Sequence, residues 1–463
     1  MLFVFPKGGI KLSEDFSIKL PTFENIFNPK KVEYADISNI ISNTDSLITE
    51  PEKEKKIDTL RADANDLITN VYKIQYPNGE KEILYPFFRE LKNLKSSGKL
   101  IRILHYGDSQ IEGDRITSYL RFKFQNMFGG SGAGMLPILN VTKSISLNVN
   151  ASDEWKKYTV IGKKDSTLNH KRYGALLNFA RFSPVSNDSI LNDSINYEAL
   201  ITLKKSNLTY YNTRQFNQLR LFYGYNKQAF TIELFDKEEK LIRKDSLEAR
   251  NSATTISWKF EKTPELLTLK LKGKDSPDFY GIAVDNTYGV AVDNIPLRGS
   301  AGLDFAKTDL VFLSKMYRYL EVKLLVLEFG VNVVPNVVDN YDYYERWFYN
   351  NLRALKRINP EISIIVIGLS DMARKTESGN YYESYPNIGL IRDAQKKAAF
   401  KAGCGFWDLY EAMGGKNSMP SWVFAKPPLA AKDFTHFNHK GAKIISQMFF
   451  NALITDYKEF ANQ

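Results

Sequence analysis

The junction near residue 107, where an apolar segment meets a helix, constrains the fold of this chain more than any other stretch. Residues 101–106 read IRILHY, Gly107 ends this run, and Asp108 and Ser109 follow. From about residue 112 to residue 128 apolar side chains recur at helical spacing. A strand that passes directly into a helix is typical of an α/β sheet, in which the carboxyl ends of parallel strands face the ligand crevice.

Ser109 has two interpretations at this position. A serine at the carboxyl end of a parallel strand reaches the crevice and lies near the first N–H groups of the next helix, as a nucleophile requires. An Asp-Ser pair before a helix is also a common helix cap. The choice between them depends on the polar residues that the rest of the chain supplies.

Strand and helix patterns alternate from residue 281 to the end of the chain. The apolar strand 324–332 is followed by a helix, a strand, a helix and a short strand, at 342–358, 363–369, 390–402 and 405–408. This alternation predicts an α/β fold with a doubly wound parallel sheet flanked by helices. A further helix is expected over 84–95, before the strand that ends at Gly107.

The pattern changes between residues 141 and 280, where short alternating runs are separated by turn-forming residues. Such runs are typical of an antiparallel β-sandwich. Because α/β patterns stand on both sides of it, we expect this β domain to be inserted into the α/β domain. The expected division is therefore an extended or partly helical stem at 1–75, the first part of the α/β domain at 76–140, the inserted sandwich at 141–280 and the second part at 281–463.

A near-repeat follows the inserted segment. Residues 281–286 read GIAVDN and residues 289–294 read GVAVDN, with two residues between them. Two adjacent strands joined by a tight connection are the simplest interpretation. The glycine-rich segment 129–134 lacks the Gly-Lys-Ser/Thr of a phosphate-binding loop, so we interpret it as a structural loop.

Composition and charge limit the classes of partner. The net charge is +10, and residues 141–280 hold 23 Lys and Arg against 16 Asp and Glu, scattered among strands and turns. This distribution resembles a solvated β surface more than a nucleic-acid footprint, so no nucleic-acid partner is expected. No apolar window is long enough to cross a bilayer. The start, MLFVFP and a basic stretch, is interpreted as the end of a longer export signal or membrane anchor.

Polar residues that suit catalysis recur at the ends of later segments. Gly299 follows a strand and can present its N–H without a side chain in the way, and Asn332 ends the apolar strand. Near the C-terminus Asp433 and His436 are three residues apart, a spacing that lets both side chains face the same way. His439 lies close behind and is a rival base.

These segments together resemble the conserved blocks of the SGNH, or GDSL-type, hydrolases. GlyAspSer at 107–109 resembles the first block, AsnIleProLeuArgGly at 294–299 the second, GlyValAsn at 330–332 the third, and AspPheThrHis at 433–436 the Asp-x-x-His block. Two residues depart from the family pattern: Gln110 replaces the usual leucine, and Val333 replaces an aspartate that often follows the asparagine.

The resemblance implies a role for each residue. Ser109 would be the nucleophile, His436 the general base and acid, and Asp433 the residue that orients the imidazole. The N–H groups of Ser109 and Gly299 and the amide of Asn332 would bind the oxyanion. No metal or other cofactor is expected, because the sequence has no metal-ligand or nucleotide motif.

The position of the β insert and the amino-acid sequences around Ser109 and His436 resemble those of bacterial carbohydrate esterases of the peptidoglycan O-acetylesterase type. This implies a carbohydrate-binding-module-like insert, an acetylated polysaccharide or peptidoglycan substrate, and a location in the periplasm or cell envelope. Two alternatives stay open. The same triad would also serve an O-acetyltransferase, and a non-catalytic glycan-binding protein would carry these residues without using them.

Overall fold

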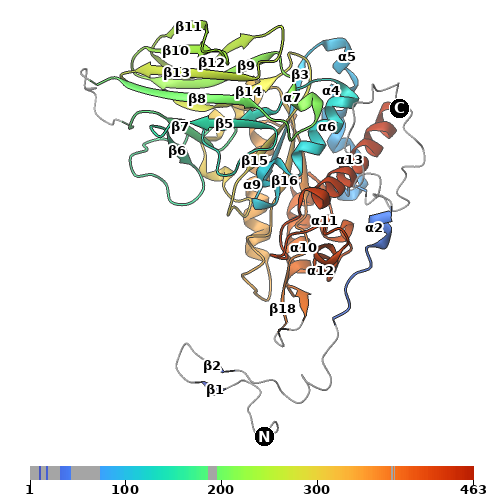
Figure 1. Ribbon diagram of the computed structural model, residues 1–463. Coiled ribbons are helices and arrows are strands. Elements are labelled where there is room, and N and C mark those ends of the chain that lie inside the picture. The colour runs from blue at the N-terminus through green and yellow to red at the C-terminus, as the bar shows by residue number, and fades with distance from the viewer. Residues whose placement is uncertain are drawn as a thin grey trace.

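The computed structural model describes residues 32–42, 73–185, 195–376, 379 and 381–463, together with the backbone of two short paired strands, β1 (Ile10–Lys11) and β2 (Ser17–Ile18). Most of the stem expected at 1–75 lies outside the described residues. Figure 1 shows a body built of two parts, with antiparallel sheets in the upper part and a helix-flanked sheet below them.

The lower part contains a five-stranded parallel sheet. Its strands lie in the order β15 (Gly289–Pro296), β3 (Leu100–Gly107), β16 (Val322–Glu328), β17 (Ser363–Ile367) and β20 (Gly405–Trp407). Every neighbouring pair is parallel. The expected α/β class and parallel sheet are confirmed, and the chain segments that form the sheet come from both sides of the antiparallel part.

Helices cover both faces of this sheet because alternate residues of each strand point to opposite sides. In β3, Leu104 and Tyr106 join one apolar cluster, whereas Ile101 and Ile103 join another. The first cluster is completed by α8 (Leu310–Tyr319), α9 (Asp342–Ile358) and α10 (Ile388–Lys401), and the second by α4 (Tyr85–Lys92), α6 (Thr117–Phe128) and α13 (His439–Ala461).

The helix after β3 begins later than its apolar spacing predicts. Residues Ser109–Asp114 form a 3-10 segment, η3, and α6 begins at Thr117. Gly113 has φ +67°, a left-handed conformation that ends any regular helix at this point. This irregular segment keeps Ser109 and its neighbours on a separate turn at the edge of the sheet.

The upper part consists of two antiparallel sheets. One contains β11 (Leu241–Leu247), β10 (Phe230–Phe235), β13 (Leu266–Gly273), β8 (Tyr197–Lys205) and β5 (Leu147–Ala151), in that order. The other contains β12 (Arg250–Lys259), β9 (Gln218–Asn226), β14 (Asp278–Asp285), β7 (Asn178–Arg181) and β6 (Lys156–Thr159), with β4 (Gly134–Leu136) paired to β14. Apolar side chains of both sheets share one cluster. The antiparallel strands thus begin at residue 134 and end at residue 285, a few residues outside both of the limits, 141 and 280, that we expected from the sequence.

The near-repeat does not form two adjacent strands of one sheet, and that expectation is wrong. The first copy lies in β14 of an antiparallel sheet, and the second forms β15 at the edge of the parallel sheet. The aspartates at the fifth position of the two copies, Asp285 and Asp293, both accept a 2.6 Å hydrogen bond from the buried guanidinium of Arg102 in β3. The repeat therefore marks the point where the chain crosses between sheets.

The glycine-rich segment 129–134 runs along these two strands. A Cβ atom at Gly130 would stand 2.7 Å from the carbonyl oxygen of Val290, and one at Gly132 would collide with that of Val284. Glycine is needed here for close approach of backbones. The segment packs the antiparallel sheet against the parallel one.

Shorter elements complete the fold. They are η1 (Pro77–Gly79), η2 (Lys81–Leu84), α5 (Leu94–Ser97), α7 (Tyr211–Arg214), η4 (Phe305–Lys307), β18 (Ala373–Lys375), β19 (Tyr382–Ser384), α11 (Leu409–Ala412) and α12 (Ser418–Phe424). The described residues before 73 include α2 (Ser38–Ser42), and this segment packs on α12 through the buried Ile37 and a Tyr34–Phe424 ring stack. Within the described ranges, no helix is both long and apolar enough to span a bilayer.

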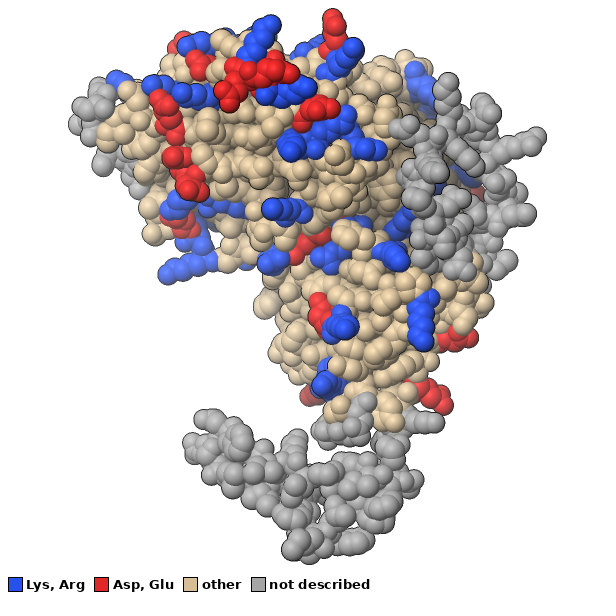
Figure 2. Space-filling view, viewed as in Figure 1, with Lys and Arg blue, Asp and Glu red and all other residues tan. Residues whose placement is uncertain are grey.

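Charged side chains are intermixed on the face seen in Figure 2. Basic and acidic groups alternate over the antiparallel sheets, where pairs such as Lys244–Glu233 and Lys272–Glu198 bridge neighbouring strands. Exposed pairs of this kind contribute little to stability and leave no strong field of one sign. The basic surplus of the central segment is thus spread over this surface.

Candidate active site

The register of the parallel sheet brings three loops to one edge. Pro296 of β15 and Glu328 of β16 both pair with Gly107 of β3. The chain leaves all three strands at this level, and backbone hydrogen bonds join the exits: Leu297 N–H donates to Gly107 O at 2.7 Å and Asp108 N–H donates to Glu328 O at 3.1 Å. The loops that carry Gly299, Ser109 and Asn332 therefore begin side by side.

Ser109, His436 and Asp433 form a continuous hydrogen-bonded chain. Ser109 Oγ lies 2.8 Å from His436 Nε2, and His436 Nδ1 lies 2.7 Å from Asp433 Oδ2. The serine and the histidine are 327 positions apart in the sequence, so this contact depends wholly on the fold. With Nδ1 bonded to a carboxylate, Nε2 is the nitrogen that accepts a proton from the serine hydroxyl.

The Asp433 carboxylate is prepared to act as an anion. Partial burial alone would raise its pKa, but the hydrogen bonds from the His436 ring and from the backbone N–H groups of His436 and Thr435 outweigh it, so the pKa lies below its usual value. An ionised carboxylate fixes the tautomer of the imidazole and stabilises the imidazolium that forms when Nε2 takes a proton.

Asp108 ties the nucleophile to the loop that carries Asn332. Its Oδ2 accepts hydrogen bonds from the N–H groups of Gly330 and Val331, and its Oδ1 accepts one from Gln110. Complete burial and the nearby Glu328 raise the pKa of Asp108 to about 7, against the lowering effect of these backbone donors. Sequence reasoning treated this aspartate only as a helix cap, and the structure gives it a second partner.

Gly299 and Asn332 lie at adjacent loops on the same side of the sheet. The exposed Asn332 donates one amide hydrogen to Ser300 O at 2.9 Å, which leaves the second N–H of the amide to a ligand oxygen. Gly299 has φ +81°, and within the described ranges no acceptor pairs with its backbone N–H. These two of the three predicted oxyanion donors are thus linked through Ser300.

Gln110, the residue that departs from the family pattern, holds the histidine loop. Its side-chain amide donates to Thr435 O at 3.0 Å and to Ser370 Oγ at 3.1 Å, and its carbonyl oxygen accepts from Phe437 N–H at 3.0 Å. The residues on both sides of His436 are therefore fixed by the neighbour of Ser109. The replacement of the family's usual leucine by Gln110 is the only feature of the sequence that could have indicated this positioning role.

Glu112 and Arg298 form a second brace that sequence reasoning missed. Two parallel hydrogen bonds of 2.5 and 2.6 Å join the guanidinium to the carboxylate. Glu112 is buried, whereas more than half of the Arg298 side chain is exposed. Because Arg298 directly precedes Gly299, this bidentate pair anchors the glycine loop to η3.

Neither His105 nor His439 contacts Ser109. His105 is buried beneath the site, with Nε2 3.0 Å from Glu328 Oε2 and Nδ1 2.9 Å from Thr117 Oγ1. His439 is the first residue of α13 and lines a neighbouring cavity. Of the two rival bases, His436 is therefore the one in contact with the serine. No group of three or more His, Cys, Asp or Glu side chains within the described ranges is arranged to hold a metal ion.

Comparison with known proteins shows which solved structures have a similar fold. No protein-family model matches this sequence, and no curated protein is significantly similar to it. A solved structure titled as a peptidoglycan O-acetylesterase in action matches with a TM-score of 0.61 and 20% identity, over 81% of this chain and 96% of that chain. The fold resembles that of the SGNH-type esterases.

Two smaller proteins match over part of the chain. An acetyl xylan esterase matches with a TM-score of 0.27 and 15% identity, over 35% of this chain and 81% of its own. A GDSL-like lipase from Bacteroides thetaiotaomicron matches with a TM-score of 0.26 and 18% identity, over 35% and 76%.

Proposed function

We propose that this protein is a serine esterase that removes O-acetyl groups from a cell-envelope or other polysaccharide. The observation that carries the proposal is the chain of contacts from Ser109 Oγ to His436 Nε2 and from His436 Nδ1 to Asp433. A nucleophile, a base and a group that orients the base at these distances are the requirements of acyl transfer through a covalent intermediate.

In the first half of the reaction, Ser109 Oγ attacks the carbonyl carbon of the acetyl ester while its proton passes to His436 Nε2. The tetrahedral oxyanion is bound by the N–H groups of Ser109 and Gly299 and by the Asn332 amide. Removing one such donor typically costs about 3 kcal/mol of transition-state stabilisation. Collapse of the intermediate breaks the ester bond, and the proton on Nε2 passes to the departing sugar oxygen.

In the second half, a water molecule attacks the acetyl-serine and loses its proton to His436 Nε2. The acetate then leaves as Ser109 recovers this proton. A quarter of the His436 side chain and about half of the Asp433 side chain are exposed, so water reaches the base directly.

The antiparallel sheets give the polysaccharide a second surface. We infer that they form a β-sandwich resembling a carbohydrate-binding module, since both sheets contribute to one apolar cluster and the Arg102–Asp285 ion pair joins them directly to the catalytic domain. A polymeric glycan of this kind lies outside the cytoplasm, and we therefore expect the enzyme to act in the cell envelope.

Acetate release tests the proposal. The wild-type protein is expected to release acetate from 4-nitrophenyl acetate and from an acetylated glycan chosen among peptidoglycan, xylan and alginate. Ser109→Ala is expected to lower kcat by about 10³-fold or more while leaving the melting temperature unchanged. A fluorophosphonate should add one phosphonyl group to Ser109 of the wild-type protein, as read by mass spectrometry.

Two controls separate the outcomes. Offering acetylated donors together with free oligosaccharides distinguishes a transferase, in which the acetyl group would appear on the acceptor. If the wild-type protein releases no acetate from any substrate and no phosphonyl group is found on Ser109, the esterase proposal is wrong.

A further inference from the structure

We infer that a cavity beside Ser109 and His436 binds the carboxylate of an acidic sugar, so that the preferred substrate is an acetylated glycan carrying carboxylate groups. This inference rests on the proposed esterase function and specifies its substrate class. Three observations support it: the position of the cavity, a guanidinium that forms no ion pair with a carboxylate of the described residues, and a second cation at the rim.

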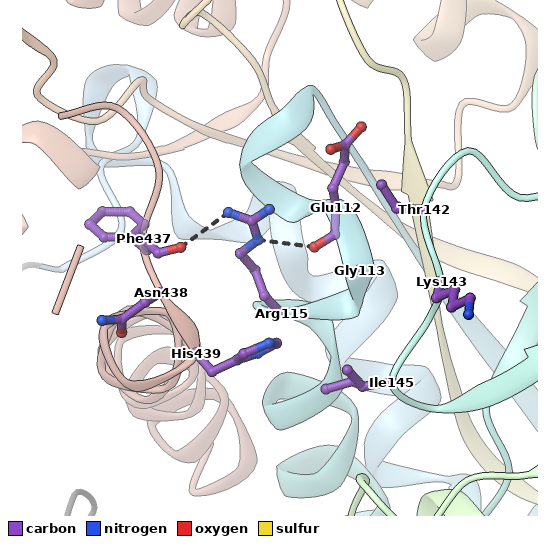
Figure 3. A pocket seen from close by; sticks show the side chains of 9 residues that line it. All are labelled: Glu112, Gly113, Arg115, Thr142, Lys143, Ile145, Phe437, Asn438 and His439. Carbon is purple, nitrogen blue, oxygen red and sulfur yellow. Dashed lines mark hydrogen bonds between the residues drawn. The ribbon is translucent and has the colours of Figure 1, made fainter. Parts of the chain in front are cut away.

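The cavity has a volume of about 330 Å³, within the roughly 300–1,000 Å³ usual for small-ligand sites. Three segments far apart in the sequence line it: η3 and the residues after it, the loop that leads into the antiparallel sheets, and the start of α13 (Figure 3). Ile145 adds apolar surface suited to the C–H groups of a sugar ring.

Its position adjoins the catalytic residues. Arg115 donates a 3.1 Å hydrogen bond to the carbonyl oxygen of Phe437, the residue after His436. The same side chain donates to Glu112 O, three positions after Ser109. A glycan whose acetyl group reaches Ser109 would therefore place a neighbouring substituent or sugar in this cavity.

The guanidinium of Arg115 provides the charge. Figure 3 shows it between the start of α13 and η3, held by backbone carbonyl oxygens. In the part of the chain that the structure describes, no carboxylate forms an ion pair with Arg115, although the charges of Glu112, Asp433 and Glu328 act on it from a greater distance. The carboxylate of Glu112 turns away from it and is occupied by both hydrogen bonds from Arg298. A half-buried cation without a paired anion favours an anionic ligand.

Lys143 and His439 extend this recognition at the rim. Lys143 is exposed, and no ion pair to it is found within the described ranges. Partial burial and the charge of Arg115 lower the pKa of His439, which favours a neutral ring that hydrogen-bonds a sugar hydroxyl. A carboxylate held by Arg115 and Lys143, next to hydroxyls held by His439, is the chemistry of an acidic sugar.

Two kinds of glycan present such a group: a uronic acid carries it on the ring, and a muramic acid carries it on a lactyl ether. The test compares kcat/KM for O-acetylated oligogalacturonate, for peptide-free O-acetylated peptidoglycan strands, and for the carboxyl-reduced form of each. At least one acidic substrate is expected to exceed its reduced form by about tenfold, and the better one identifies where the carboxylate stands.

Variants at the cavity assign this preference to its residues. Lys143→Gln, an exposed change that leaves the core untouched, is expected to lower the acidic-to-reduced ratio by about fivefold. Arg115→Gln should lower it by about tenfold or more. Lys240→Gln, in the turn between β10 and β11 and outside the cavity lining, is the matched control and should leave the ratio unchanged.

The outcomes separate this inference from the esterase proposal. If acetate is released without a preference for either acidic substrate, or if the preference survives both variants, the cavity assignment is wrong. If no substrate releases acetate, the esterase proposal fails, and a binding measurement then tests whether the cavity holds an acidic sugar. Ser109→Ala protein would then be titrated with oligogalacturonate and its carboxyl-reduced form. Tighter binding of the acidic oligomer that Lys143→Gln weakens would support the cavity, and equal binding would overturn it.

Discussion

The carbonyl oxygen of the Gln110 side chain accepts the backbone N–H of Phe437 at 3.0 Å, so the residue after the serine holds the residue after the histidine. The two catalytic loops are thus fixed relative to each other by one buried amide as well as by the Ser109–His436 contact. Positioning of this kind keeps the reacting atoms within the narrow range that catalysis requires.

Replacing Gln110 by leucine, the residue usual in the family, is expected to loosen the His436 loop. Three hydrogen bonds are lost, each worth about 1 kcal/mol, and kcat should fall about tenfold or more with KM little changed. Steady-state kinetics and thermal unfolding measure both effects. Gln447→Leu on α13, whose bonds reach Tyr119 and Asn451, is the control. Equal losses of kcat in the two variants would contradict the positioning role.

Asp433→Asn tests the orientation of the imidazole. The amide can still accept the backbone N–H of His436, but it no longer stabilises an imidazolium at Nδ1. Since the carboxylate is about half exposed, we expect kcat to fall by about 10²-fold, less than for a fully buried aspartate. Aryl acetate hydrolysis measures this change. A variant that keeps most of the wild-type rate would show that Asp433 does not act through His436.

The Glu112–Arg298 pair is expected to act on the Gly299 loop. Glu112→Gln or Arg298→Gln should lower kcat several-fold, and the double variant should lose little more than either single one. The coupling between them is expected to be about 1 kcal/mol, because Arg298 is largely exposed. Arg243→Gln, which breaks an exposed pair with Asp245, is the control. Additive losses in the double variant would rule out a shared role.

Asp108 should make stability depend on pH. Its pKa is raised to about 7 in the folded protein, against about 3.9 when unfolded. Between these values the folded state keeps a proton that the unfolded state has lost, so a rise in pH destabilises the fold. The free energy of unfolding of the wild type, minus that of Asp108→Asn, should fall from about pH 4 to about pH 7 and then level off. Urea unfolding at several pH values measures this, and a difference that rises with pH would contradict it.

The nearness of the three loops that carry Ser109, Gly299 and Asn332 follows from features that a sequence displays. Parallel strands place their carboxyl ends at one edge, so the residues after Gly107, Pro296 and Glu328 meet there once the strand order is as observed. Four ordered motifs therefore predict that Ser109, Gly299, Asn332 and His436 lie together. The choice between His436 and His439 depends on the turn from Asp433 to His436. The spacing of three residues lets the Asp433 carboxylate bond Nδ1 of the His436 ring, while Nε2 of the same ring contacts Ser109.

Other features could not be read from local patterns. The periodicity of apolar residues shows which face of a strand is buried but not which sheet the strand joins. For this reason the two copies of the near-repeat resembled the two strands of a hairpin, although they belong to different sheets. Likewise, the apolar spacing predicts a helix from about residue 112, but the left-handed conformation of Gly113 interrupts it and α6 begins only at Thr117. Gln110 and Arg298 each pair with a residue more than 180 positions away, and nothing near either residue in the sequence identifies its partner.

The buried cluster of Arg102 with Asp285 and Asp293 bears on how this architecture can change. Asp285 belongs to an antiparallel sheet, whereas Arg102 and Asp293 belong to the parallel one, and all three are inaccessible to solvent. Removing one partner of a buried ion pair costs about 3–5 kcal/mol. The antiparallel part is therefore not an exchangeable module. Excising or swapping it requires a simultaneous change at Arg102, and the two parts of the molecule should unfold in a single cooperative transition.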